Sequence, residues 1–112
     1  MSLIETNVNI PVNDSESYNL TVEFGDGQQG SSSMEKFDGN FVVGKIKNEP
    51  IGSGSSLKNK RLIIASMVTD VNPDTNWTSI TYFLNDTKIK GLSKEADKEH
   101  SSVFYVTRLN FI

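Results

Sequence analysis

Residues 61–84, RLIIASMVTDVNPDTNWTSITYFL, decide the fold class of this chain. Side chains alternate between the two faces of a strand, and from Leu62 to Val71 apolar residues occur on both faces. This pattern is typical of a central strand that is covered on each side, because the β-branched residues and the turn chemistry at 72–74 disfavour a buried helix. The run 77–84 then alternates aromatic and β-branched residues in a second strand. We therefore predict a hairpin, in which a polar turn joins the two strands.

The rest of the chain shows the same two-residue alternation between turn signals. Apolar residues at every second position predict strands that end near residues 12 and 24, and a last strand at 103–112. Asp38-Gly39 predicts a hairpin turn, since both positions of a two-residue turn favour positive φ. Two segments rich in Gly and Ser, 25–33 and 48–59, are expected to be loops. Residues 88–90 are expected to form a short edge strand with outward lysines.

Seven or eight strands without crossover helices predict an all-β fold. The expected architecture is an antiparallel β-sandwich built as a single domain over residues 1–112, and a small β-barrel is the alternative. The helical content is expected to be at most one short turn near residues 93–99, which Ser93 is placed to cap.

Composition and charge narrow the function classes. The chain has no cysteine, so it has neither a disulfide nor a thiolate nucleophile. Residues 1–33 hold five acidic and no basic residues (−5), whereas residues 34–112 hold 11 basic against nine acidic residues (+2). We expect the early strands to lie beside basic later strands in one domain, and pairing between copies is the alternative. No basic patch carries aromatic residues, which argues against nucleic acid as a partner.

The sequence as written contains no targeting or membrane signal. Its first residues lack the basic and apolar regions of a signal peptide, and no apolar run approaches the roughly 20 residues of a membrane span. The localisation stays open.

Two glycine-rich motifs and the lone histidine do not predict catalysis. Residues 25–30 (GDGQQG) match G-x-G-x-x-G, but no helix follows to bind a pyrophosphate. Residues 52–56 (GSGSS) lack the Gly-Lys-Ser/Thr ending of a phosphate loop. His100 adjoins Ser101, and adjacent side chains on a strand point apart. We therefore expect a protein that is not an enzyme, with no catalytic residue and no cofactor.

The turn at 70–76 predicts a candidate calcium site. Calcium prefers six to eight oxygen ligands, and oxygen-bearing side chains occur here at every second position. The candidate ligands are Asp70, Asn72, Asp74 and Asn76, with Asp14, Glu16 or Asp26 from neighbouring loops. The EF-hand pattern itself fails, because Thr75 stands where glycine is required. The residues favour the alternative that these side chains only hydrogen-bond their own backbone to form the turn.

Three aromatic residues are candidates for a ligand-binding platform that stacks on sugar rings: Trp77, Tyr82 and Tyr105. Trp77 and Tyr82 have opposite parity on their strand, so they point to opposite faces. Packing in the core is the favoured alternative for most of the three.

Two functions of different classes follow. The leading hypothesis is a non-catalytic interaction or structural module that acts through protein–protein assembly, with itself or with a protein partner. The second hypothesis is a module that binds carbohydrate or another small ligand, assisted by calcium at the turn.

Overall fold

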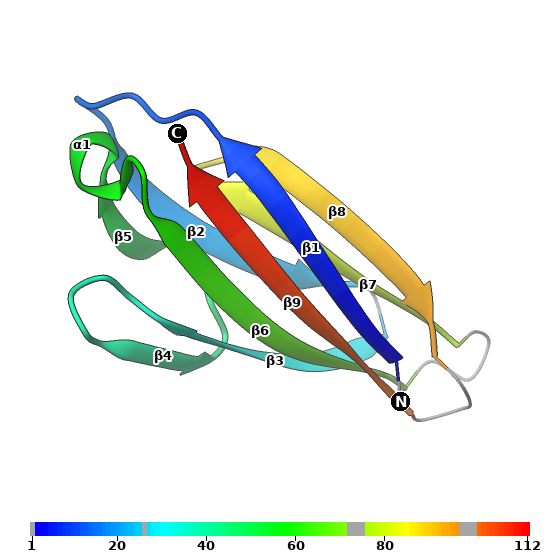
Figure 1. Ribbon diagram of the computed structural model, residues 1–112. Helices are drawn as coiled ribbons and strands as arrows, with labels where there is room; N and C mark the ends of the chain where they lie inside the picture. Colours follow the sequence, from blue (N-terminus) through cyan, green and yellow to red (C-terminus); the bar gives the residue numbers. More distant parts are fainter. Residues whose placement is uncertain (1, 26, 72–75, 97–100) are drawn as a thin grey trace.

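The computed structural model describes residues 2–25, 27–71, 76–96 and 101–112, which form nine strands and one short helix. The strands lie in two sheets that pack face to face, and in these residues the sheets do not close into a barrel (Figure 1). The β-sandwich prediction is confirmed, with nine strands instead of seven or eight. The elements are β1 (Ser2–Ile10), β2 (Ser17–Phe24), β3 (Gln28–Glu35), β4 (Phe41–Gly44), β5 (Glu49–Ser53), α1 (Gly54–Leu57), β6 (Arg61–Asp70), β7 (Trp77–Leu84), β8 (Thr87–Glu95) and β9 (Ser102–Phe111).

The five-stranded sheet has the order β1-β9-β6-β3-β4. Its strand β9 runs antiparallel to β6 and parallel to β1, from Ser2 opposite Val103 to Ile10 opposite Phe111. The parallel pair corrects the fully antiparallel sandwich that the sequence predicts. Parallel strands need a long connection between them, and β1 and β9 are separated by most of the chain.

The four-stranded sheet has the order β5-β2-β7-β8 and is antiparallel throughout. Strand β8 forms its edge, as predicted for residues 88–90, but extends to Glu95. The helical turn expected near 93–99 is therefore wrong for residues 93–95, which pair with β7 instead. Pairing with a neighbouring strand overrides the weak local preference of Ser93 for a helix start. Ala96 also belongs to no helix, and residues 97–99 of that prediction lie outside the described residues.

The predicted hairpin over 61–84 is wrong, although both of its strands form. Strand β6 lies in the five-stranded sheet and β7 in the four-stranded sheet, so the chain crosses from one sheet to the other between them. A turn signal predicts a reversal of the chain and says nothing about whether the two strands hydrogen-bond to each other. Strand β6 is central, as predicted, with β9 on one side and β3 on the other.

The two expected loops contain regular structure. Residues 28–33, expected to be a loop, belong to β3, which pairs with β6 from Gln28 opposite Asp70 onward. The segment 48–59 contains β5 and the helical turn α1, which Ser53 caps by accepting a hydrogen bond from the Ser56 N–H at 3.2 Å. The sequence signals fail because strand residues here are mostly Gly, Ser and Gln, whose local preferences favour turns.

The predicted hairpin turn at Asp38-Gly39 is confirmed between β3 and β4. Its loop is longer than two residues, because the Lys36 N–H donates to the Asn40 carbonyl at 2.8 Å. Gly39 has a φ of +89°, which a residue with a side chain rarely adopts.

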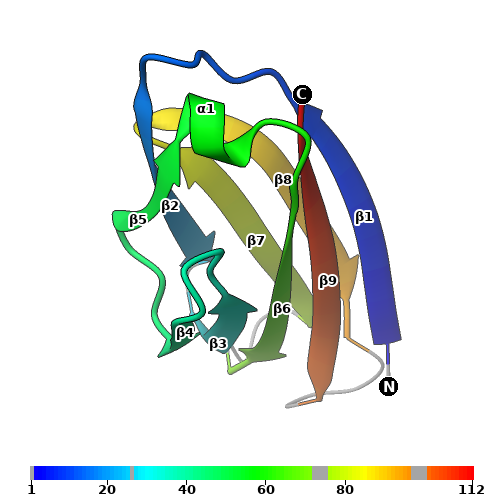
Figure 2. The same ribbon diagram turned by 60° about the vertical axis from the view of Figure 1, so that its left-hand side comes forward.

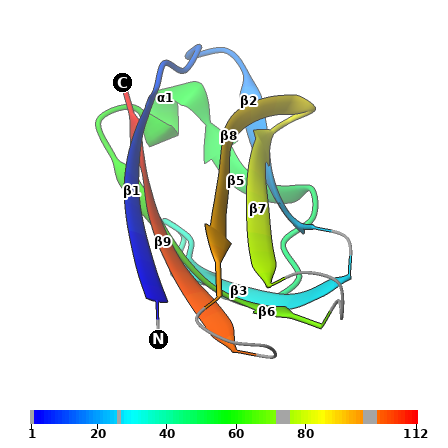
Figure 3. The ribbon, with the colours of Figure 1, turned by 90° about the vertical axis from the view of Figure 1, so that its right-hand side faces the viewer.

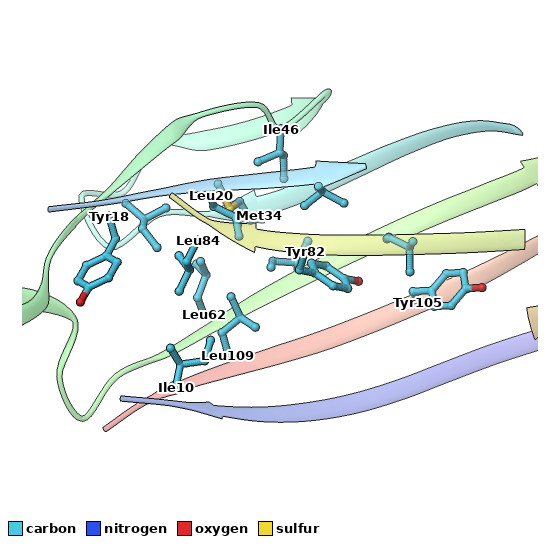
Figure 4. Close-up of a cluster of buried hydrophobic side chains, with 14 of the residues drawn as sticks. Ile10, Tyr18, Leu20, Met34, Ile46, Leu62, Tyr82, Leu84, Tyr105 and Leu109 are labelled. Atoms are coloured by element: carbon cyan, nitrogen blue, oxygen red, sulfur yellow. The ribbon is translucent and has the colours of Figure 1, made fainter. Parts of the chain in front are cut away.

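The core lies between the sheets and is built from alternate residues of their strands (Figure 4). Tyr82, Tyr105, Leu109 and Leu62 are at most 1% exposed. Because β9 has β1 and β6 on its two sides, five successive inward side chains of this strand are fully buried: Val103, Tyr105, Thr107, Leu109 and Phe111.

Gly54, the first residue of α1, is expected to resist substitution. Its N–H donates to the Glu16 carbonyl at 2.8 Å, and an added Cβ would overlap the Asn13 carbonyl oxygen. We expect Gly54→Ala to lower the free energy of unfolding by about 1–3 kcal/mol, as overpacking does. Chemical denaturation checks this, with Ser55→Ala as the exposed control in the same turn. Equal stability of the two variants would contradict the close packing of α1 on the 11–16 segment.

Candidate functional site

The outer face of the five-stranded sheet, which is turned toward the viewer in Figure 1, carries a cluster of exposed apolar side chains. Val43 is 74% exposed, Phe41 72%, Ile63 49% and Met67 42%. Half-buried Phe104 and Val106 of β9 lie on the same face. We call the whole cluster the outer apolar face, and its residues are Leu3, Phe41, Val43, Ile63, Ala65, Met67, Phe104 and Val106.

The strand register makes these side chains neighbours. In one row Met67 lies opposite Phe104, and Phe104 lies opposite Leu3. In the next row Ala65 lies between Val106 on β9 and Ser33 on β3. Side chains that lie opposite each other on adjacent strands have Cβ atoms about 5 Å apart and are in contact. The outer apolar face is therefore continuous from β1 to β6.

Small residues on β3 leave a shallow hollow within this face. The hollow has a volume of about 270 Å³ and lies between Val43 on β4 and Met67 and Phe104 on the other side. Ser31 and Ser33 form its floor, since both point outward from β3 and have short side chains. An apolar side chain of a bound molecule has room to enter here.

Charged groups of both signs border the face. Arg108 donates from Nη2 to Glu5 Oε1 at 3.2 Å across the β1–β9 pair, and Arg61 donates from Nε to Asn110 Oδ1 at 2.8 Å. The Lys60 ammonium lies 5.1 Å from the centre of the Phe37 ring, within the range of a cation–π contact. The face thus has an apolar centre and a polar border, as protein interfaces do.

In the described residues, two ion pairs join the acidic first third of the chain to basic residues of the remainder, as expected, although only one of them connects two strands. One pair is Glu5 with Arg108, and the other is Asp14 with Lys58 at 2.8 Å. Both pairs are exposed on at least one side, so each contributes at most about 1 kcal/mol.

The outer face of β7 in the four-stranded sheet is more polar at its centre. There Ser79 lies opposite Ser93, and Thr81 lies opposite Glu23 on one side and Gly91 on the other. Sheets that face water alternate apolar inward and polar outward residues, as β7 does in this region. The five-stranded sheet departs from that rule on β6, where the outward residues Ile63, Ala65 and Met67 are all apolar. The prediction that β6 is covered on each side is therefore wrong for the part of the chain that the structure describes, in which only the inward face of β6 is covered.

The three aromatic candidates do not come together as an exposed platform. Tyr82 and Tyr105 are fully buried, whereas Trp77 is 51% exposed at the start of β7. Burial raises the pKa of Tyr82 to about 12 and also raises the pKa of Tyr105. Thr107 donates to the Tyr82 hydroxyl oxygen at 2.7 Å, and the Tyr105 hydroxyl lies 2.7 Å from Thr78 Oγ1. Each of the two tyrosine hydroxyls thus has a buried hydrogen-bond partner.

The predicted calcium turn lies only partly within the described residues. Asp70 is buried at the end of β6, and the Asn76 carbonyl accepts a hydrogen bond from the Ala96 N–H at 2.7 Å. Asn72 and Asp74, like Asp26 among the proposed neighbouring ligands, lie outside the described part of the chain. Within the described part, no group of three or more acidic, His or Cys side chains is arranged to hold a metal ion. The calcium site stays a prediction.

His100 also lies outside the described residues, so the prediction about catalysis is untested by the structure. In the described ranges, no helix is long and apolar enough to cross a membrane.

Comparison with known proteins assigns no family to the chain. It matches no protein-family model, no curated protein and no solved structure.

Sequence reasoning found part of the outer apolar face. The second apolar parity of β6 is visible in the sequence, but the pattern alone predicts a buried face where the structure has an exposed one. The contribution of β4 was missed, because Phe41 and Val43 reach this face only through the pairing of β4 with β3. The signal in the sequence was that Phe41 and Val43, which point to the same face of this short strand, are both large and apolar.

Proposed function

We propose that this chain is a non-catalytic β-sandwich module that binds a protein partner through the outer apolar face. The observation that carries the proposal is the apolar outward parity of β6, exposed at the centre of a sheet. A central strand with two apolar faces normally has both of them covered. The described part of the chain covers one of the two faces of β6, so a partner is expected to cover the other.

The size and shape of the face suit a folded partner. Neighbouring strands lie about 4.8 Å apart, so five strands make a face about 20 Å wide. Monomeric proteins rarely leave a large continuous apolar patch uncovered unless it binds something. We infer a partner with a flat apolar surface, from which one larger side chain enters the hollow beside Met67 and Phe104.

The border of the face adds specificity. Glu5, Arg108 and Arg61 place charges of both signs around the apolar centre. A partner with complementary charges is expected to bind in one orientation, since like charges brought together are unfavourable.

Met67→Lys is expected to weaken the binding of such a partner at least about tenfold, because an unpaired charge buried in an apolar interface costs more than about 1.4 kcal/mol. The matched control is Thr81→Lys, which places the same charge at the centre of the other outer face, opposite Glu23. The unchanged chain and the two variants would each be immobilised on a resin and incubated with an extract of cells that produce the chain. The captured proteins would be identified by mass spectrometry, and their affinities for the purified variants measured by calorimetry.

The expected result is at least one protein that the unchanged chain and Thr81→Lys both bind and that Met67→Lys loses. If every captured protein binds the three forms equally, the outer apolar face is not the binding surface. Circular dichroism would first establish that both variants keep the strand content of the unchanged chain.

The second hypothesis, a calcium-assisted module for carbohydrate, has less support. Among Trp77, Tyr82 and Tyr105, only Trp77 is exposed, so the three rings do not form a shared stacking surface. It stays a prediction, and quenching of Trp77 fluorescence on addition of glycans would favour it.

A further inference from the structure

The sandwich has four edge strands in the described residues, and three of them carry features that discourage pairing with another chain. Strand β4 has only four residues. Strand β5 has five residues, includes Pro50 and joins its neighbour through a register shift. Strand β8 carries Lys88, Lys90 and Lys94 and also has a register shift against β7.

Strand β1 has none of these features (Figure 2). It is nine residues long, contains no Lys, Arg or Pro, and keeps an unbroken register with β9 from Ser2 to Ile10. Long and regular edges present a row of backbone N–H and C=O groups that another strand can pair with. Edge β1 is therefore the strand of this fold best suited to accept a further strand.

The inward side chains of β1 are incompletely covered. Ile4, Thr6 and Val8 are half-buried, whereas Ile10 at the end of the strand is buried. Figure 3 shows the side of the sandwich where β1 and β8 border the two sheets, with β8 as the nearest strand of the opposite sheet. A further strand beside β1 would complete the burial of Ile4 and Val8.

The sequence of β1 is complementary to itself in the antiparallel direction. Centring the pairing on Thr6, the middle residue of the strand, places Ile4 opposite Val8 and Leu3 opposite Asn9 of the second copy. Inward residues meet inward residues, because each residue pairs with one of the same parity. Glu5, the only charged residue of the strand, meets Asn7 and not a second Glu5. The pairing thus has apolar contacts on the inner side and no repulsion between like charges.

We propose that two copies of this chain pair through β1, antiparallel about a twofold axis at Thr6. The two five-stranded sheets become one ten-stranded sheet, in which neither β1 is an edge. Thr6 lies opposite Thr6 of the second copy, a cross-strand pair that stabilises sheets. The dimer forms through the backbone edge of β1, whereas the proposed function uses outward side chains of the sheet, so the dimer does not depend on the proposed function.

Cysteine cross-linking tests the register directly, because the chain has no cysteine of its own. Directly opposite residues of antiparallel strands have Cα atoms about 4.5–5.5 Å apart, within the range of a disulfide. Thr6→Cys is therefore expected to form a covalent dimer under mild oxidation. Leu3→Cys is the control: Leu3 is 58% exposed and more accessible, but lies far from Leu3 of the second copy in this register. Equal cross-linking of the two variants, or none at Thr6→Cys, overturns the proposal.

Two variants at Asn7 provide a second and reversible measurement. Asn7→Lys brings a lysine opposite Glu5 of the second copy twice in each dimer, whereas Asn7→Glu brings two pairs of like charges together. Sedimentation equilibrium is expected to give a dissociation constant at least about fourfold lower for Asn7→Lys than for Asn7→Glu.

The effect of these two substitutions on the stability of the monomer is expected to be opposite to their effect on dimerisation. Residue 7 lies opposite Arg108 on β9, so in the monomer Glu is favoured over Lys at this position. A thermal melt at low protein concentration is expected to show that order. If the unchanged chain is monomeric at all accessible concentrations, or if Asn7→Glu associates as tightly as Asn7→Lys, no β1 dimer forms.

Discussion

Replacing Phe111 with alanine is expected to lower the free energy of unfolding by about 3–5 kcal/mol, the range for removing a buried aromatic ring. Phe111 is 1% exposed, and its backbone joins β9 to the residues that precede β6 through the Lys60 carbonyl at 3.0 Å and the Asn59 N–H at 2.8 Å. The lost ring leaves a cavity between the sheets that neighbouring side chains fill only in part.

The matched control is Ile112→Ala, one residue away. Ile112 is 56% exposed, so its truncation is expected to change the free energy of unfolding by no more than about 0.5 kcal/mol. Urea denaturation followed by circular dichroism measures both. Similar losses in the two variants would mean that the inward face of β9 does not extend to its last residue.

The second large effect is a loss of stability at high pH that depends on Tyr82. An exposed tyrosine has a pKa of about 10, and burial in the core raises that of Tyr82 to about 12. The folded state therefore holds the phenol proton more tightly than the unfolded chain does. This contribution to the free energy of unfolding is fully present below pH 10 and is lost as the pH rises from 10 to 12. The free energy of unfolding then falls by up to about 1.4 kcal/mol per pH unit.

Tyr82→Phe separates this effect from other titrations. The variant lacks the ionisable hydroxyl, so it is expected to lose about 2–3 kcal/mol less than the unchanged chain between pH 9 and 12. At neutral pH it is expected to be less stable by about 1–3 kcal/mol, because the buried Thr107 hydroxyl loses its partner at 2.7 Å. Parallel pH profiles for the two proteins would contradict the burial of this hydroxyl.

A buried pair of serine hydroxyls explains why part of the fold was not visible in the sequence. Ser32 of β3 and Ser66 of β6 are buried, and their hydroxyl oxygens lie 2.6 Å apart. Burial of these serines is acceptable because each hydroxyl has a partner. If only apolar residues are counted as inward, residues 28–33 (QQGSSS) are predicted to be a loop, although they form the start of strand β3.

Local patterns predicted most of the strands correctly. They were less successful in predicting to which sheet each strand belongs. Alternation located β2, β7 and β9, because each has one apolar and one more polar face. The separation of β6 from β7 into different sheets depends on pairings with β9, β3 and β2, which are far away in the chain. Such pairings are set by the packing of the whole core, which no single segment encodes.

The same limit applies to the candidate site. The outward residues of β6 are recognisable as apolar, but their exposure follows from the absence of any chain segment over them in the described structure. The aromatic candidates failed to form a platform because the inward parity of Tyr82 and Tyr105 places both in the core. Parity assigns side chains to a face, and only the register shows which face is inside.

The parallel pairing of β1 with β9 has a consequence for the order of events during synthesis. The strands of the four-stranded sheet all lie between residues 17 and 95, so they leave the ribosome before β9 does. Until residues 102–111 emerge, β1 has no partner and β6 has only β3. At about 5–20 residues per second the first strand waits several seconds for its neighbour. During that interval the edges of β1 and β6 that later pair with β9 are both unpaired, and unpaired strand edges can pair with other chains.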